Sequence, residues 1–243
     1  MYPAYSNCFC VCRYARKHEI LVFSRAFVKV YKQKHDKKQR LSAFYRVGFM
    51  TARSLILASS SLYRRGLLER LRIPFATSSP QVDETARPGE LPRETALRLA
   101  LAKARAVAAA NPQALIIGSD QVADLDGHSL GKPGNHDSAV MQLRAMSGRS
   151  VIFHTALCVL DAASGRHQID NVPTAVRFRE LSDAQIATYL RIEQPYDCAG
   201  SAKIESLGVA LVHKIESDDP TALIGLPLMM LVSMLKREHI EVV

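Results

Sequence analysis

The sequence predicts an α/β fold in which helices flank a mixed, twisted sheet. Strand-like and helix-like segments alternate between residues 54 and 238, which is the order typical of α/β proteins. Two strand-like segments, 150–160 and 171–179, are separated by Asp161-Ala-Ala-Ser-Gly165, which is typical of a hairpin connection. Because a hairpin pairs its strands antiparallel, we expect a mixed sheet rather than a purely parallel one.

The first 49 residues differ from the rest of the chain in charge. They hold eleven Lys and Arg against two acidic residues, whereas the rest has 21 of each sign, so the formal net charge of +9 lies in this leader. Its apolar run 20–23 is too short for a secretory or membrane segment. It is an upstream mis-start with Met50 as the natural start, a basic arm, or a targeting segment. We favour the first, and expect 1–49 to be disordered or absent and 50–243 to form one domain.

Hydrophobic runs and capping residues define the individual elements of that domain. Gly148 is a C-cap type after one helical pattern, and Ser182 is an N-cap type before the next. We expect strands at 54–58, 73–78, 114–119, 150–160, 171–179 and 207–215, and helices at 61–71, 92–110, 135–147, 182–192 and 221–238.

The turn after the first strand has the composition of a phosphate site. Residues 55–58 are uncharged, as in a strand covered on both faces, and Ser59 to Ser61 are N-cap types ahead of a helical pattern. An oxyanion there would meet free backbone N–H groups, serine hydroxyls, and the guanidinium of Arg64 or Arg65. The alternative is an ordinary capped helix with two solvated arginines.

The helix 92–110 carries one lysine on an unexpected face. Glu94, Arg98 and Arg105 share one side of the helix, whereas Lys103 lies on the opposite side. Its neighbours there are apolar, namely Ala96, Leu99, Ala100 and Val107. Lys103 therefore either has a buried partner or extends past the alanines to solvent.

Carboxylates follow two of the expected strands. Asp120 comes just after Gly118 at the end of the strand 114–119, where α/β sheets place ligands, and Asp83 and Glu84 lie in a loop after another strand. Oxygen ligands of this kind suit Mg²⁺ or Mn²⁺ bound between carboxylates and substrate phosphates. The alternative is an ordinary strand-end aspartate with ordinary loop acids.

Several functional classes are excluded or weakly supported. Gly127 to Pro133 lacks the spacing and the Ser or Thr of a Walker A loop, although Lys132 could still contact a phosphate. The neutral body argues against a nucleic-acid surface, and no segment fits a membrane span. Only Cys158 and Cys198 lie in the body, which suits a reducing compartment, so we expect the cytoplasm.

Taken together, these residues and their order resemble the Maf family of nucleotide pyrophosphatases. The likeness covers residues 53–240, and one departure is Leu62, where the family usually has proline. The motifs that carry it are Leu-Ile-Leu-Ala-Ser-x-Ser-x-x-Arg-Arg, Val-Asp-Glu-Thr, Lys103, Ile-Ile-Gly-Ser-Asp-Gln-Val, Gly-Lys-Pro and Cys-Ala-Gly-Ser-x-Lys-x-Glu.

The resemblance implies hydrolysis of a nucleoside triphosphate to the monophosphate and pyrophosphate. It also implies a divalent metal, Mg²⁺ or Mn²⁺, a cleft between two lobes of the sheet, and a homodimer. Asp120 corresponds to the family's proton acceptor, and Glu84 with Asp120 would hold metal or water. The residues that would grip the triphosphate are Ser59, Ser61, Arg64, Lys103 and Lys132.

Three further positions bear on the base. Relatives acting on dTTP and UTP tend to carry Arg, Thr and Gln where this chain has Tyr63, Gln121 and Glu205, which resembles the branch acting on 7-methyl-GTP. N7-methylated guanine is cationic, so an aromatic ring and a carboxylate would attract it, and Gln121 could bond a base edge. In the simpler alternative, Tyr63 packs and Glu205 is solvated. A dTTP/UTP pyrophosphatase and a non-catalytic, nucleotide-binding regulator of cell division are alternative functions.

Overall fold

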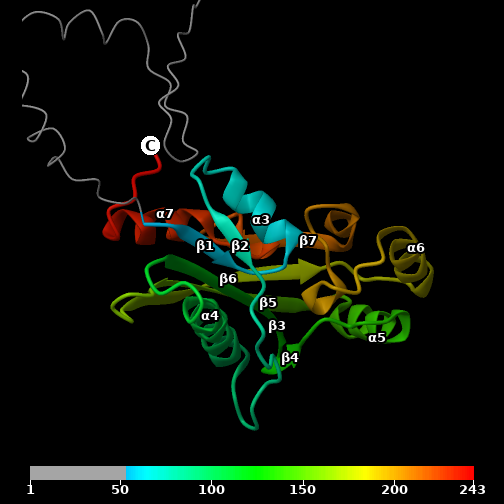
Figure 1. Ribbon diagram of the computed structural model, residues 1–243. Coiled ribbons are helices and arrows are strands. Elements are labelled where there is room, and N and C mark those ends of the chain that lie inside the picture. Colours follow the sequence, from blue (N-terminus) through cyan, green and yellow to red (C-terminus); the bar gives the residue numbers. More distant parts are fainter. Residues whose placement is uncertain (1–52) are drawn as a thin grey trace, which may run out of the picture. The chain divides into compact units, whose positions relative to one another are not determined.

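A mixed sheet of seven strands runs through the part of the chain that the computed structural model describes, residues 53–243 (Figure 1). The strand order is β2-β1-β3-β5-β6-β7, and β4 pairs with β3. The predictions made for residues 1–49 lie outside the described residues. No described helix is long and apolar enough to cross a membrane.

The sheet is parallel at one end and antiparallel elsewhere, as expected. β1 (Leu55–Ala58) pairs in parallel with β2 (Ala76–Ser78) and with β3 (Leu115–Leu125). The remaining strands pair antiparallel: β4 (His128–Leu130), β5 (Ser150–Asp161), β6 (His167–Phe178) and β7 (Val212–Ser217). The hairpin predicted around residues 161–165 joins β5 to β6.

Helices cover both faces of the sheet and enclose three buried clusters. α4 (Pro92–Ala108) lies on one face, whereas α3 (Leu62–Glu69) and α7 (Leu228–Arg237) lie on the other (Figure 1). α5 (His136–Met146) and α6 (Asp183–Glu193) enclose a separate cluster with Phe153 and Phe178. β3 and β5 contribute side chains to all three clusters, so these long strands join the α3–α7 core to the α5–α6 core.

Strand pairing beyond residue 119 makes β3 longer than the sequence predicts and adds β4. β3 continues to Leu125 instead of stopping near residue 119, because its antiparallel ladder with β5 extends from Leu115 to Asp124. It then turns through Asp126 and Gly127, both at positive φ, into β4, which the sequence did not predict. The Asp124-Leu-Asp-Gly segment is thus a turn.

The two C-terminal differences arise from backbone breaks. α7 begins at Leu228 rather than near residue 221, because Gly225 has φ of 117° and Pro227 lacks a backbone donor. Residues 222–224 form only a short 3₁₀ turn. Residues 207–211 are likewise a 3₁₀ turn, and β7 begins only at Val212. Ser182 caps α6 as predicted, with its side chain accepting from the Gln185 N–H.

Candidate active site

The close approach of α4 to β3 creates the centre of the site. Gly118 leaves no room for a side chain, since a Cβ there would lie 2.2 Å from the Ala100 carbonyl oxygen and 3.0 Å from the Ala104 Cβ. The helix backbone therefore rests directly on the strand. Lys103, on the sheet-facing side of α4, then meets Asp120, two residues beyond Gly118. The parallel ladder of β1 and β3 also ends at Gly118, so Asp120 lies just past the carboxyl end of β1.

Lys103 has a buried partner rather than an exit to solvent. Its ammonium donates to Asp120 Oδ1 at 2.5 Å and lies 2.6 Å from Glu84 Oε1, while only 4% of the residue is exposed. One ammonium thus joins a strand carboxylate to a loop carboxylate 36 residues earlier in the chain. Burial of this kind requires paired charges, so the three groups depend on one another for stability.

Arg64 lies within the same charge cluster, whereas Arg65 does not. Arg64 is partly buried, and its Nε donates to the Gly225 carbonyl at 2.8 Å, which leaves the two terminal nitrogens of the guanidinium for another ligand. Arg65 instead pairs with Glu69 on the exposed side of α3. Burial lowers the pKa of Arg64, and the nearby Asp120 and Glu84 oppose that shift.

The serines of the turn cap α3 and keep their hydroxyl protons available. Ser61 is the N-cap, and its Oγ accepts from the Arg64 N–H at 3.4 Å, while Ser59 Oγ accepts from the Ser61 N–H at 3.1 Å. Ser61 therefore caps α3, as in the alternative of an ordinary capped helix. Of the two arginines, however, only Arg65 is solvated. In both hydroxyls the oxygen accepts, so the O–H can still donate to an anion near the start of the helix.

The two carboxylates have opposite pKa shifts. Burial raises the pKa of Asp120 despite the opposing effect of Lys103 and Arg64, and the neighbouring Glu84 raises it further. Partial burial also raises the pKa of Glu84, but Lys103, Lys132 and Arg64 outweigh it, so the net shift is downward. Two acids with different proton affinities at one place suit one proton-accepting group beside one permanently charged ligand.

Lys132 completes the cluster from the loop after β4. Its ammonium is exposed and lies 3.7 Å from Glu84 Oε2. The adjoining Gly131 carbonyl accepts from the Gly200 N–H and from Gln142 Nε2, which fixes the loop. Arg64, Lys103 and Lys132 face Glu84 and Asp120, a net charge of +1 that favours an anionic ligand.

The residues present fit a divalent metal whose coordination would be completed by substrate phosphates. Asp120 Oδ1 and Glu84 Oε1 contact Lys103, so the oxygens that point away from this ammonium are Asp120 Oδ2 and Glu84 Oε2, and Glu84 Oε2 has only the longer contact of 3.7 Å with Lys132. Between residues 53 and 243 no group of three or more His, Cys, Asp or Glu could hold a metal by itself. Mg²⁺ is commonly bound by one or two carboxylates plus substrate phosphates, and this donor set matches that arrangement.

The three base-side candidates lie in different environments. Tyr63 on α3 has the Lys203 ammonium 5.6 Å from its ring centroid, and Lys203 is bonded to Glu193 at 2.6 Å. Partial burial raises the pKa of Glu205, and the neighbouring Glu193 and Asp197 raise it further. Asp197 and Lys203 act in opposite directions on the pKa of Tyr63, and Asp197 also acts on Glu205.

Gln121 is already bonded through its amide nitrogen. Nε2 lies 2.9 Å from Thr155 Oγ1, 3.1 Å from the Ala222 carbonyl and 3.0 Å from the Leu223 carbonyl. Only Oε1 then remains for a ligand, so Gln121 can accept from a base edge but has no spare donor. This is narrower than the donor-and-acceptor role expected from its residue type.

Some residues of the site were not found from the sequence. Ser119 Oγ lies 2.9 Å from the Gly225 carbonyl, which also binds Arg64. Lys203 and its partner Glu193 border Tyr63. Lys203 lies inside the Cys-Ala-Gly-Ser-x-Lys-x-Glu motif, so that motif was a usable signal for it, whereas Glu193 and Gly225 had none.

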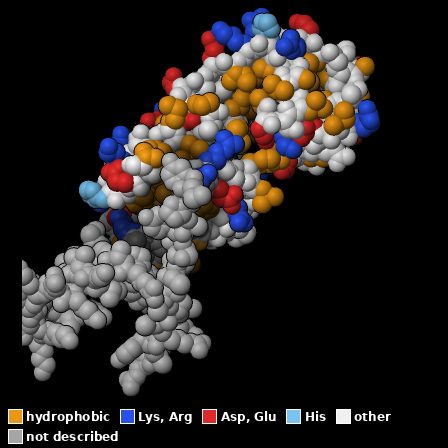
Figure 2. All heavy atoms as spheres, turned by 90° about the horizontal axis from the view of Figure 1, so that it is seen from above, with side chains coloured by type: hydrophobic (Ala, Val, Ile, Leu, Met, Phe, Trp, Pro, Cys, Tyr) orange, Lys and Arg blue, Asp and Glu red, His pale blue; other side chains and the backbone are white. Residues whose placement is uncertain are grey.

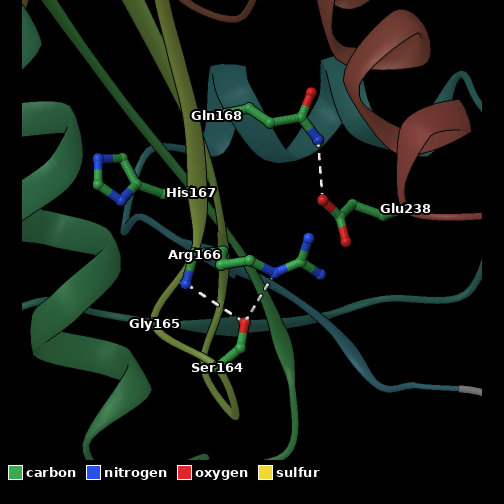
Figure 3. Close-up of a pocket in the computed structure, with 6 residues that line it drawn as sticks. All are labelled: Ser164, Gly165, Arg166, His167, Gln168 and Glu238. Carbon is green, nitrogen blue, oxygen red and sulfur yellow. Dashed lines mark hydrogen bonds between the residues drawn. The ribbon is translucent and has the colours of Figure 1, made fainter.

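One surface hollow is separate from this cluster. It has a volume of about 520 Å³ and lies beside the β5–β6 hairpin and the end of α7 (Figure 3). Its polar groups already bond one another: Gln168 donates to Glu238 at 3.0 Å, and Arg166 donates to Ser164 at 3.3 Å. The hairpin follows Asp161, which pairs with Leu115 at the amino end of β3, whereas Asp120 lies past the carboxyl end of β1.

The fold and the charge cluster together define a class: an α/β protein with a strand-end site suited to a polyphosphate and a divalent metal. Comparison with known proteins is more specific. Residues 54–238 match the family model described as "Maf-like protein". The chain belongs to the Maf family, which confirms the resemblance seen in the sequence.

Named relatives in this family are similar over nearly their whole length. A protein of Methylobacillus flagellatus is 59% identical over 189 residues, which are 78% of this chain and 98% of the relative. One from Burkholderia thailandensis is 61% identical over 185 residues, 75% of this chain and 86% of the relative. One from Thiobacillus denitrificans is 56% identical over 192 residues, which are 79% of this chain and 96% of the relative. Each of these relatives is named "7-methyl-GTP pyrophosphatase".

Proposed function

We propose that this protein hydrolyses a nucleoside triphosphate, most favourably 7-methyl-GTP, to the monophosphate and pyrophosphate with a divalent metal. The observation that carries the proposal is the buried Lys103 shared by Asp120 and Glu84, with Arg64 near both carboxylates and two serine hydroxyls at the start of α3, the helix that carries Arg64. A merely structural ion pair would not require Arg64 to lie near two carboxylates with terminal nitrogens that donate to no residue between 53 and 243. The names of the relatives support the same activity.

In this reaction the chain holds charge and moves one proton. Arg64, Lys103, Lys132 and the hydroxyls of Ser59 and Ser61 bind the phosphates and stabilise the negative charge that develops on them. Glu84 and Asp120 would hold the metal, which supplies Lewis-acid polarisation of phosphate oxygens when bound. Asp120 accepts the proton of the attacking water. The water oxygen bonds to the α-phosphorus, and the bond from that phosphorus to the bridging oxygen breaks to release pyrophosphate.

The charges around Tyr63 support a cationic base. Lys203 is neutralised by Glu193, so Asp197 remains as excess negative charge near the ring, and Glu205 is close enough to Asp197 to interact with it. A base methylated at N7 is attracted by that excess and by the aromatic face. Lys203 opposes the binding of a cationic base, because its ammonium already lies over the Tyr63 ring. That single observation favours a neutral base, and keeps dTTP and UTP as the second candidate substrates.

The deciding experiment compares pyrophosphate release from 7-methyl-GTP, GTP, dTTP and UTP, each with Mg²⁺ and then Mn²⁺. We expect the highest initial rate with 7-methyl-GTP at equal substrate concentration. A higher rate with dTTP or UTP would reject the base assignment and keep the hydrolytic chemistry. If the protein binds nucleotide but releases no pyrophosphate with either metal, the result would instead support a non-catalytic regulator.

The partners and the location form part of the same proposal. A nucleotide is the proposed ligand, and nucleic acid is not, because neither charge sign forms a broad patch on the described surface seen in Figure 2. The free thiols of Cys158 and Cys198 support a reducing, cytoplasmic location. A homodimer is proposed on the family resemblance, and light scattering of the purified protein would test it.

A further inference from the structure

We propose that Asp219 and Thr221, whose side chains bond to residues between 219 and 230, are positioning residues that hold Arg64 and Gln121 in place. They would act through the backbone of residues 219–226, the loop between β7 and α7, here named the carbonyl loop. The inference rests on the proposed function, because it assigns a role in the same site.

Three carbonyl oxygens of the carbonyl loop bind side chains of the candidate site. The Gly225 carbonyl accepts from Arg64 Nε at 2.8 Å and from Ser119 Oγ at 2.9 Å. The Ala222 carbonyl accepts from Gln121 Nε2 at 3.1 Å and from Thr155 Oγ1 at 2.9 Å. The Leu223 carbonyl is a further acceptor for Gln121, at 3.0 Å. One loop therefore orients a phosphate-side residue and a base-side residue together.

The carbonyl loop is itself closed by Asp219 and Thr221. Asp219 Oδ1 accepts from the Thr221 N–H at 3.0 Å, and the Thr221 Oγ lies 2.7 Å from the same oxygen. Thr221 Oγ is also 2.9 Å from the Leu226 carbonyl and accepts from the Leu228 N–H at 2.8 Å. Asp219 Oδ2 accepts from the Met229 N–H at 2.7 Å, at the start of α7. The two side chains thus join both ends of the loop to each other.

The loop needs this closure because its own conformation is unusual. Gly225 has φ of 117°, in the region that only glycine adopts readily, and Arg64 Nε would lie 3.4 Å from a Cβ at that position. Asp219 is buried, with 2% exposed, which is rare for an aspartate unless its oxygens are fully bonded. Capping of α7 explains the bonds of Asp219 Oδ2, but it does not explain the bonds of Oδ1 and Thr221 that hold the loop closed.

The test compares Thr221→Val, which removes the hydroxyl, with Thr221→Ser, which keeps it. The matched control is Asp161→Asn, since Asp161 is a buried aspartate that binds the Ala163 N–H and Ser164 Oγ in the hairpin beyond the amino end of β3. We expect Thr221→Val to lower kcat/KM for 7-methyl-GTP and the affinity for inorganic pyrophosphate, each about tenfold, as for loss of about one buried hydrogen bond. Thr221→Ser and Asp161→Asn should stay within about threefold of the wild type.

A second readout needs no substrate and separates this inference from the proposed function. In ¹H–¹⁵N spectra the Arg64 Nε–H should exchange slowly with water in the wild type, because Gly225 accepts from it. It should exchange faster in Thr221→Val and remain protected in Thr221→Ser and Asp161→Asn. If the proton stays protected in Thr221→Val, or if the control loses it equally, the positioning role is wrong, whether or not the protein releases pyrophosphate.

Discussion

At the scale of single residues, the site depends on one lysine that has two acidic partners. Lys103 satisfies Asp120 and Glu84 at once, so the cost of burying an ammonium is offset by two close carboxylates. Because Asp120 has a raised pKa, it is the better proton acceptor of the two acids near neutral pH.

Asp120→Asn should abolish most turnover while the protein remains folded. Loss of a general base typically costs about 10²–10⁴-fold in rate, and Glu84 still neutralises Lys103 in the variant. The measurement is single-turnover pyrophosphate release, with circular dichroism and thermal unfolding as the check on folding. Near-normal release by the folded variant would remove Asp120 from its proposed role.

The pH profile of the wild type should report the same group. Asp120 must be ionised to accept a proton, and its pKa is raised by burial, so kcat/KM should fall on acidification at a higher pH than for an ordinary aspartate. At alkaline pH Asp120 stays ionised, so its titration predicts no loss of kcat/KM there. The acidic limb should be absent from the residual activity of Asp120→Asn, and a limb that persists unchanged would belong to another group.

Glu205→Gln should lower discrimination between 7-methyl-GTP and GTP by up to about fivefold, since a partly exposed charge pair contributes about 1 kcal/mol at most. The ratio of the two kcat/KM values measures it. Because the pKa of Glu205 is raised by partial burial, by Glu193 and by Asp197, the wild-type ratio should also decline on acidification as this carboxylate is protonated. Glu216→Gln, on exposed β7, is the control and should leave the ratio unchanged. An unchanged ratio in Glu205→Gln would support the interpretation that this residue is merely solvated.

At the scale of elements, the site is formed where three of them meet. β1 ends in the serine turn, α4 lies against β3 at Gly118, and the carbonyl loop connects β7 to α7. Each element contributes one part: the turn supplies hydroxyls, the helix supplies the lysine, and the loop supplies carbonyl acceptors for Arg64 and Gln121. A change in the spacing between α4 and β3 should therefore affect activity without altering any charged residue.

Gly118→Ala tests that spacing. The added methyl would overlap the Ala100 carbonyl oxygen, so α4 must move away, at a cost of about 1–3 kcal/mol in the free energy of unfolding. Lys103 would then separate from Asp120, and turnover should fall by more than the loss of folded protein explains. Urea unfolding and kcat are the measurements. Gly66→Ala in α3 is the matched control, because no atom outside the adjoining residues and the backbone of its own helix lies within 4 Å of the new Cβ, and it should keep or raise stability. Equal behaviour of the two variants would contradict the close-packing argument.

At the scale of the whole molecule, charge divides the chain. The first 49 residues carry the formal net charge of +9, and the rest is balanced. The family match begins at residue 54, and the described residues 53–243 contain three hydrophobic clusters of their own. The domain at 50–243 therefore remains our prediction for the folded, active unit.

Deletion of residues 1–49 should leave cooperative unfolding and kcat/KM unchanged within about twofold, while salt-dependent retention on a heparin column is lost with the basic charge. Thermal unfolding, nucleotide hydrolysis and heparin chromatography of both proteins provide the measurements, at one ionic strength. Loss of activity in the shortened protein would mean that the leader is structural, which is the opposite of our expectation.

The amino-acid sequence was sufficient to predict the mixed α/β class, the strand–serine–helix turn and the family. Local patterns carry these features, because period, caps and motif order depend on neighbours along the chain. Sequence patterns also predicted that Lys103 faces away from the wet side of its helix. They could not predict its partners, because a helical period assigns a face but not the group that another element brings to that face.

Which of these residues act together depends on the tertiary structure. It selected Arg64 over Arg65, because the Gly225 carbonyl, 161 residues later, binds one guanidinium and Glu69 binds the other. It engaged the amide nitrogen of Gln121 with carbonyls about 100 residues away, which left a single acceptor for a base. These choices depend on distances of a few ångströms between segments far apart in the chain, and packing of the whole sheet and its helices sets those distances.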